Sequence, residues 1–167
     1  MNLFVIGTDL SYKTSRIFSY QTTPQMEVAE AVRISMSIPL YFESIKINDN
    51  NLPILFSDGG IMRNYPINIF DNKSVNYETL GFRFKTTNEY KEINNLIQYI
   101  TALFHSFLKI QQDIYENSPK DIARTVEIKT GGLSPLNFNI EVNDEIYNYL
   151  FYQGYYATLN FIKKRIN

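Results

Sequence analysis

The segment "LPILFSDGGIMRNYP", residues Leu52–Pro66, joins a short apolar run to one aspartate and two glycines. Glycine tolerates positive φ and lets another backbone or a ligand come close. An aspartate at the end of a strand, as predicted for Asp58, can project into a crevice, which is where open α/β sheets bind ligands. A carboxylate placed there could orient or deprotonate a nucleophile. The plain alternative is an Asp-Gly turn that only joins two elements.

Strands and helices alternate along the rest of the chain, which predicts an α/β domain. The predicted strands lie at residues 3–10, 15–21, 41–47, 52–57, 77–85 and 121–130. The predicted helices lie at residues 24–37, capped by Thr23, at 66–71, at 91–117 and at 145–165, capped by Asn143 or Asp144. Helix 91–117 is the clearest, because its apolar residues share one face. The last loop is marked by Gly131, Gly132, Ser134 and Pro135.

Composition limits the function classes. The 167 residues are 44% hydrophobic and carry a net charge of −1, so the chain fits about one domain and has no basic field to hold nucleic acid. There is no cysteine, and neither a metal-ligand spacing nor a phosphate-binding loop is visible in the sequence. The N-terminus lacks the basic region of a signal peptide, and no stretch reaches the ~18 apolar residues of a membrane span. We therefore expect a soluble, cytoplasmic protein, with export without a cleaved signal left open.

Two neighbouring patterns give the chain a family resemblance. The pattern S-x-S-I-P at residues 35–39 precedes D-G-G-x-x-x-N-Y-P at residues 58–66, and together they resemble the second half of a patatin-like phospholipase (PNPLA) catalytic domain. Residues 5–32 look like the strand, hairpin and helix of that family. The later segments "LGFRF", "RTVEIKTGGLSPLNFNI" and "LFYQGYYATLNFI" are similar to the tail of many bacterial members. The resemblance covers essentially the whole chain.

The resemblance implies a fold. It implies an incomplete patatin-like three-layer α/β/α domain, with a central sheet flanked by helices. Residues 1–71 would form the C-terminal portion of the PNPLA domain, and residues 72–167 would form an α/β tail packed on the same domain.

The resemblance also implies a chemistry. The family hydrolyses acyl esters of lipids and phospholipids through a Ser-Asp dyad, without a histidine or a cofactor. By the resemblance Asp58 is the dyad base, in a D-G-G box formed by Asp58, Gly59 and Gly60. The neighbouring loop matches at Asn64, Tyr65 and Pro66, and the helix-end segment beside the aspartate strand matches at Ser35, Ser37 and Pro39. The implied partners are a lipid or phospholipid substrate and a membrane surface.

The sequence departs from the family at the nucleophile. The family's serine lies in a G-x-S-x-G elbow, preceded by a glycine-rich oxyanion segment, and both come before the region that matches residues 3–10. This chain has no G-x-S-x-G, and "GGLSP" at Gly131–Pro135 does not replace it. We therefore expect an N-terminally truncated lipid acyl hydrolase that lacks its nucleophile, is inactive alone and could be complemented by an N-terminal fragment. The alternative is a non-catalytic remnant of the fold that binds a lipid surface or a protein.

No other residue is expected to take the role of the serine. Ser57 should point away from Asp58, because neighbours on a strand face opposite sides. Ser35 and Ser37 lie at a helix C-terminus, which disfavours developing negative charge. His105 is expected to be packed or on the surface, not catalytic. The aromatic side chains of the last two long helices either face lipid or cover the sheet, and covering the sheet is the favoured interpretation. Missing upstream strands would leave a sheet edge beside residues 3–10.

Overall fold

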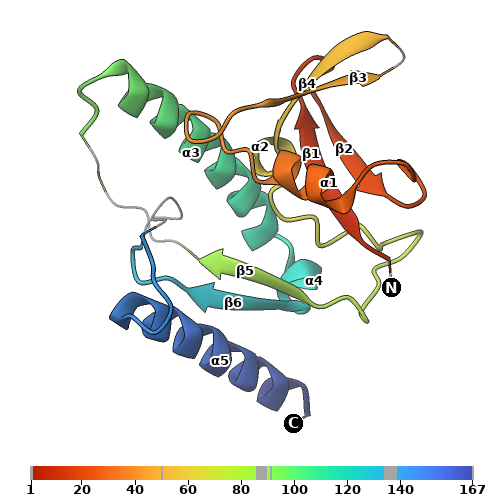
Figure 1. Ribbon diagram of the computed structural model, residues 1–167. Coiled ribbons are helices and arrows are strands. Elements are labelled where there is room, and N and C mark those ends of the chain that lie inside the picture. Colours follow the sequence, from red (N-terminus) through yellow and green to blue (C-terminus); the bar gives the residue numbers. More distant parts are fainter. Residues whose placement is uncertain (1, 50, 86–89, 91, 134–138, 167) are drawn as a thin grey trace. The chain divides into compact units, whose positions relative to one another are not determined.

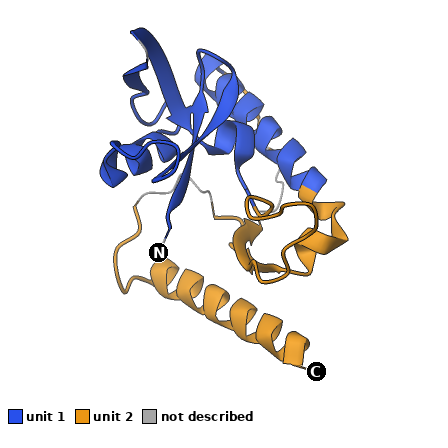
Figure 2. Ribbon diagram, turned by 90° about the vertical axis from the view of Figure 1, so that its right-hand side faces the viewer, with its two compact units in different colours: residues 1–66, 95–114 blue, residues 67–94, 115–167 orange. Residues whose placement is uncertain are grey.

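A computed structural model describes residues 2–49, 51–85, 90, 92–133 and 139–166. The chain divides into two compact units, shown in Figure 2. Unit 1 contains Met1–Pro66 and Asn95–Ile114, and unit 2 contains Ile67–Asn94 and Tyr115–Asn167. The fold is α/β, as predicted, with a central sheet and flanking helices (Figure 1).

The sheet of unit 1 is built from two hairpins. Its strands are β1 (Phe4–Asp9), β2 (Thr14–Ser19), β3 (Ile45–Asp49) and β4 (Leu52–Asp58). The order is β2-β1-β4-β3, and every neighbouring pair is antiparallel. The β1–β4 pairing joins the hairpins and sets Gly7 opposite Asp58. All four strands were predicted from the sequence, but their order was not.

Helix α1 (Val28–Ser35) packs on one face of this sheet. The core between the helix and the sheet consists of Ala31 and Ile34 of α1 together with Phe18, Ile45, Ile54 and Phe56 of the strands. The Phe18 and Phe56 rings meet edge to face, with centroids 5.5 Å apart. A Cβ at Gly7 would lie 2.6 Å from Cγ2 of Ile34, so the bare glycine lets the end of α1 approach β1 closely.

The start of α1 differs from the sequence prediction. The helix was predicted to begin at residue 24 with Thr23 as its cap, but it begins at Val28. The Thr23 hydroxyl donates to the Ser19 carbonyl (3.3 Å), and the Thr23 carbonyl accepts the Met26 N–H (3.0 Å). The polar groups of Thr23 therefore close a turn after β2, and Glu27 occupies the N-cap position.

Helices α2 (Gly60–Arg63) and α3 (Leu96–Glu116) follow the sheet. In unit 1, α1 and α3 lie on either side of the strands (Figure 2). Helix α3 was predicted over residues 91–117 and begins at Leu96, because the side-chain carbonyl of Asn95 accepts the Gln98 N–H (2.9 Å) as an N-cap. Residue 91, the predicted start, lies outside the described residues.

Unit 2 contains a parallel pair of strands, β5 (Gly81–Lys85) and β6 (Thr125–Lys129), with helix α5 (Glu145–Ile166) packed on β6. The strand predicted at residues 121–130 is shorter than expected, because its first residues belong to helix α4 (Pro119–Ile122). The predicted cap of α5 is confirmed: Oδ1 of Asp144 accepts the Tyr147 N–H at 2.5 Å.

Two predictions concern loops of unit 2. The short helix predicted at residues 66–71 is wrong, since residues 67–70 form a turn that the Asp71 N–H closes onto the Asn68 carbonyl (3.1 Å). The predicted loop at Gly131 and Gly132 is confirmed, and both residues adopt positive φ (63° and 82°). Residues 134 and 135 of that loop lie outside the described residues.

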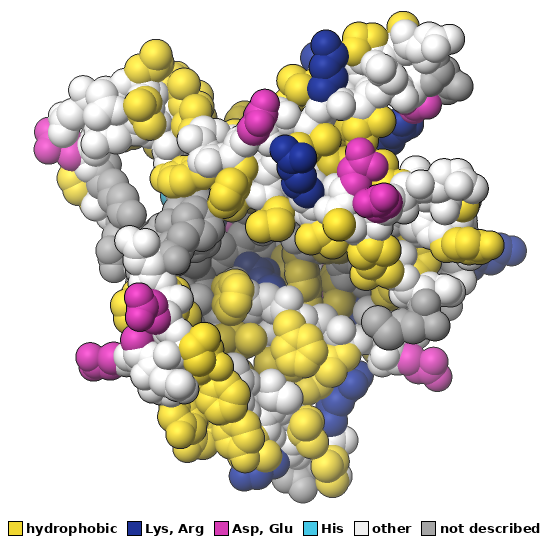
Figure 3. Space-filling model, in the orientation of Figure 1, with side chains coloured by type: hydrophobic (Ala, Val, Ile, Leu, Met, Phe, Trp, Pro, Cys, Tyr) yellow, Lys and Arg dark blue, Asp and Glu magenta, His cyan; other side chains and the backbone are white. Residues whose placement is uncertain are grey.

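Many apolar side chains of α3 and α5 are exposed. Figure 3 shows hydrophobic side chains, in yellow, over much of one face of the molecule. The apolar side chains of α3 and α5 that are more than half exposed are Leu96, Ile97, Tyr99, Phe107, Ile110, Ile114, Phe151, Tyr152, Tyr155, Tyr156 and Ile166. The prediction that these faces are buried against a sheet is wrong for these side chains. On α5 the reason is size, because strands of 5 residues extend about 17 Å and a helix of 22 residues extends about 33 Å. No helix within the described ranges is long and apolar enough to cross a membrane.

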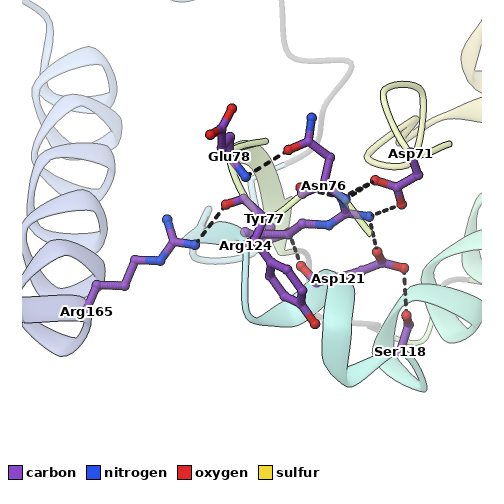
Figure 4. A network of polar contacts seen from close by, with 9 residues as sticks. Asp71, Asn76, Tyr77, Glu78, Ser118, Asp121, Arg124 and Arg165 are labelled. Atoms are coloured by element: carbon purple, nitrogen blue, oxygen red, sulfur yellow. Dashed lines mark hydrogen bonds and ion pairs between the residues drawn. The ribbon is translucent and has the colours of Figure 1, made fainter. Parts of the chain in front are cut away.

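A buried arginine ties the segments of unit 2 together (Figure 4). The Arg124 side chain is 0% exposed. Its guanidinium donates to both carboxylate oxygens of Asp71 (2.5 and 2.6 Å), to Asp121 (2.7 Å) and to the Asn76 carbonyl (3.0 Å). This arrangement lowers the pKa of Asp71 to about 2, chiefly through the hydrogen bonds from Arg124. Arg124 thereby fixes the loop before β5 to the start of β6.

We expect Arg124→Met to lower the free energy of unfolding by about 3 kcal/mol, because it leaves mostly buried carboxylates without their partner. Since folding lowers the pKa of Asp71, the stabilisation is present at neutral pH and is lost as the pH falls from about 4 toward 2. Urea unfolding at pH 7 and pH 3 measures both effects. The exposed Lys163→Met variant on α5 is the control, and an equal loss in both variants would contradict the role of Arg124.

Candidate active site

Asp58 is the last residue of β4, and its backbone is held from two sides. The Thr8 hydroxyl of β1 donates to the Asp58 carbonyl at 2.8 Å. The Asp58 N–H donates to the Ser37 carbonyl, just beyond α1, at 3.0 Å. The position of the carboxylate therefore follows from strand pairing and from the end of α1.

Gly59 is required for a close approach, and its φ is an ordinary −64°. A Cβ at this position would lie 2.2 Å from the Ile6 carbonyl oxygen of β1, which is a backbone atom. The Gly59 N–H also points to the Ser35 carbonyl at 3.4 Å. Of the two glycine properties considered from the sequence, the structure uses close packing and not positive φ.

Gly60 gives the carboxylate its hydrogen-bond donor and its space. Its N–H donates to Oδ1 of Asp58 at 2.6 Å. A Cβ at Gly60 would lie 2.8 Å from that same oxygen and 2.9 Å from Oδ1 of Asn64. The Asp58 carboxylate is thus folded toward the first turn of α2, so the site contains the Asp-Gly turn that the sequence offered as the plain alternative.

A depression of about 500 Å³ opens beside this turn, and Asp58 lines it. Its polar lining residues are Ser35, Asp58, Arg63 and Asn64, together with the backbone of the two glycines. Its apolar lining residues are Phe4, Val5, Ile6, Val32, Met36 and Pro66. The turn and the crevice are therefore present together, and the crevice suits a molecule with a polar and an apolar part.

Partial burial raises the pKa of Asp58, and the hydrogen bond from the Gly60 N–H opposes part of that rise. A carboxylate with a raised pKa is a stronger base than a fully hydrated one. Asp58 can therefore accept a proton in this depression.

Two of the three serines considered from the sequence as nucleophiles, Ser57 and Ser37, have hydroxyl groups bonded to backbone carbonyls. Ser57 is fully buried, and its hydroxyl donates to the Ser37 carbonyl at 2.9 Å. The Ser37 hydroxyl is also buried and donates to the Ile34 carbonyl at 2.7 Å. Ser35 lines the depression with Asp58, at the end of α1. His105 is half-buried on α3, with its ring 6.3 Å from that of Phe104.

Sequence reasoning missed one residue that contacts the site, Gln111 on α3. Its side-chain nitrogen donates to the carbonyls of Gly60 (3.0 Å) and Ile61 (3.1 Å). Its side-chain oxygen accepts the Asn64 N–H at 2.7 Å. No sequence signal points to this contact, because Gln111 is 51 residues from Gly60 and lies in a helix assigned only by its apolar face.

Of the neighbouring loop predicted from the family pattern, Asn64 and Pro66 both line the depression. Tyr65 lies between them and is half-buried. Among the residues that the structure describes, no group of histidine, cysteine or acidic side chains could hold a metal ion.

These features define an α/β protein with a carboxylate-based candidate site beside an amphiphilic depression. Residues 1–71 match the sequence model of the family described as patatin-like phospholipase. That segment contains the aspartate, both glycines and all the other residues named above as lining the depression. The match to this family therefore covers the part of the chain that holds the candidate site.

Curated relatives extend the similarity. The uncharacterized protein R571 of Acanthamoeba polyphaga mimivirus is 32% identical over 175 residues, which cover 99% of this chain and 56% of R571. The "probable lipid hydrolase 463L" of Invertebrate iridescent virus 6 is 37% identical over 67 residues, which cover 40% of this chain and 22% of 463L. The chain thus spans about half of R571 and matches less than a quarter of 463L.

A solved structure shares the fold. VipD from Legionella pneumophila superposes with a TM-score of 0.60 and 19% sequence identity, covering 98% of this chain and 31% of VipD. The similarity therefore extends over both units and beyond the segment that matches the family's sequence model.

The two glycines should respond differently to alanine. Gly59→Ala forces a Cβ against the Ile6 carbonyl of the backbone, and we expect a loss of about 2–3 kcal/mol in unfolding free energy. Gly60→Ala meets only the far ends of the Asp58 and Asn64 side chains, which can shift. We expect that variant to lose under about 1 kcal/mol. Urea unfolding of both variants makes the comparison, and equal losses would contradict the close approach of Gly59 to β1.

Proposed function

We propose that this chain carries the aspartate half of a lipid acyl hydrolase centre, in which Asp58 acts with a serine to cleave an ester. The observation that supports this proposal most is the position of Asp58, whose pKa is raised by burial, on the lining of a depression with polar and apolar surfaces. The substrate class is a lipid or phospholipid ester, because such a molecule has a polar ester beside long apolar chains. The match of residues 1–71 to the patatin-like phospholipase family supports the same class.

In the proposed reaction the Asp58 carboxylate accepts the proton of a serine hydroxyl as the serine oxygen attacks the ester carbonyl. The tetrahedral intermediate collapses, the proton passes to the departing alcohol, and the acyl group remains on the serine. A water molecule, deprotonated in turn by Asp58, then attacks the acyl-serine, and the proton passes back to the serine oxygen as the fatty acid is released. The Gly60 N–H keeps the carboxylate oriented during both steps.

The family's pattern places the nucleophilic serine in a G-x-S-x-G elbow, after a glycine-rich oxyanion segment. These 167 residues contain no G-x-S-x-G. Positioned nucleophiles and oxyanion donors provide most of the acceleration in such reactions. We therefore propose that the chain is inactive by itself and acts with a polypeptide segment that carries the elbow. The pairing of β1 with β4 begins only at Gly7, and Val5 and Ile6, which precede it, line the depression. This part of β1 is the proposed approach for the serine-bearing segment.

Mixing the chain with a polypeptide that carries a patatin-like serine elbow tests the proposal. We expect no hydrolysis of a fluorogenic phospholipid by either protein alone and clear hydrolysis by the mixture. Asp58→Asn should reduce the rate of the mixture by at least about 100-fold, the usual loss when a general base is removed. Asp113→Asn is the matched control, because Asp113 is an exposed carboxylate paired with Lys109 on α3.

Two results would contradict the proposal. Hydrolysis that survives Asp58→Asn would show that another residue is the base. A stable complex of the two proteins without hydrolysis would show that Asp58 does not act with a serine in this way.

A second candidate function, binding to a lipid surface without catalysis, is favoured by α5. Its aromatic side chains Phe151, Tyr152, Tyr155 and Tyr156 are each more than half exposed, and exposed basic residues follow at positions 163–165. Aromatic side chains favour the membrane interface. This function does not require Asp58.

Co-sedimentation with phosphatidylserine-containing vesicles measures that second function. If α5 binds the surface, Phe151→Ser combined with Tyr155→Ser should reduce the bound fraction several-fold, and Asp58→Asn should leave it unchanged. Absence of binding by the unaltered chain would remove this candidate.

A further inference from the structure

We propose that Gln111 is a positioning residue of the candidate active site, which makes α3 part of that site although it lies beyond the matched residues 1–71. The proposal rests on the proposed function in one respect: that function makes Asp58 a catalytic base. The hydrogen bonds of Gln111 do not depend on it. Gln111 and the residues it contacts all belong to unit 1.

Gln111 makes three hydrogen bonds, and all of them are directed at the turn that follows Asp58. One side-chain amide binds three backbone groups of a single turn: the carbonyls of Gly60 and Ile61 as donor, and the N–H of Asn64 as acceptor. The carbonyls belong to the first two residues of α2, and the N–H belongs to the residue that follows its last turn. Gln111 thus holds both ends of this four-residue helix.

A helix of this length depends on such outside contacts. Forming a first helical turn is unfavourable, because several dihedral angles are fixed for one hydrogen bond. Within α2 the Arg63 N–H bonds to the Gly59 carbonyl (2.9 Å). The amide of Gln111 contributes to fixing the same turn from a separate element.

The contact reaches Asp58 through Gly60. The N–H of Gly60 donates to the Asp58 carboxylate at 2.6 Å, and the carbonyl of Gly60 accepts from Gln111 at 3.0 Å. Movement of Gly60 would therefore change the hydrogen bond that orients the carboxylate. Gln111 acts on Asp58 by fixing the residue that lies between them.

The chemistry of the position specifies glutamine. Glutamate lacks the N–H donors that the two carbonyls need. Asparagine keeps the amide but is shorter by one methylene. Methionine has a similar length and shape but provides neither the donors nor a strong acceptor.

The test uses the full 167-residue chain and nuclear magnetic resonance. Gln111→Met removes the amide with little change in volume, and Gln112→Met makes the same change at the next position of α3. Gln111→Asn is a second variant. It keeps a side-chain amide but shortens the side chain by one methylene, so that we expect the amide not to reach α2. Each variant is first compared with the unaltered chain by its amide spectrum to establish that the fold is kept.

Two readouts are followed. Hydrogen exchange of the Asn64 amide should be at least about fivefold faster in both Gln111 variants, as expected when one neutral hydrogen bond is lost. The titration midpoint of the Asp58 carboxyl, assigned by its absence in Asp58→Asn, should move upward, because the Gly60 N–H that favours the ionised form is no longer held in place. Gln112→Met should change neither readout.

The outcomes separate this proposal from the proposed function. Unchanged Asn64 exchange and an unchanged Asp58 titration in both Gln111 variants would overturn the positioning role. A faster Asn64 exchange with an unchanged Asp58 titration would also overturn it, since Gln111 would then stabilise α2 alone. If both readouts shift but Asp58→Asn leaves the hydrolysis by the mixture intact, the positioning role stands and the proposed function fails.

Discussion

The candidate site depends on the close contact of Gly59 with the backbone of β1. The chain leaves β4 at Asp58 and must turn at once into α2, and there is no room for a side chain between this turn and the Ile6 carbonyl. Because the turn lies against β1, the Gly60 N–H falls within reach of the Asp58 carboxylate. The depression forms between the same turn, the start of β1 and the end of α1. A glycine that looks like a loop residue in the sequence is therefore a packing residue.

Asp58 lies next to this contact, and its surroundings act on its pKa in two opposite directions. Partial burial disfavours the charged form of Asp58 and raises its pKa, whereas the single N–H of Gly60 limits that rise. A carboxylate that accepted several backbone N–H groups would have a lowered pKa and would be a poor base. Asp71 in unit 2 shows the contrast, because paired hydrogen bonds from Arg124 lower its pKa to about 2 and make it a structural anion. The pKa values of the two aspartates shift in opposite directions because burial dominates at Asp58 and hydrogen bonds from Arg124 dominate at Asp71.

Much of this could be predicted from the sequence, and the failures have physical causes. The strands and the D-G-G box were found because apolar alternation and a rare motif are local signals. The start of α1 was misplaced because the Thr23 hydroxyl donates to the Ser19 carbonyl of the preceding strand. The spacing of apolar residues in the helix does not reveal this hydrogen bond. The start of α3 was misplaced because Asn95 caps it inside the predicted span. The role of Gln111 could not be predicted at all, since it follows from the tertiary placement of α3 against α2.

We propose that Asp58 is a partly desolvated base and not merely the first residue of a tight turn. A direct carboxyl titration of the unaltered chain by carbon-detected magnetic resonance tests this proposal. Partial burial predicts a titration midpoint for Asp58 clearly above the ordinary aspartate value of about 3.9. A midpoint at or below that value would show a hydrated or strongly hydrogen-bonded carboxylate, and Asp58 would then lack the proposed base character.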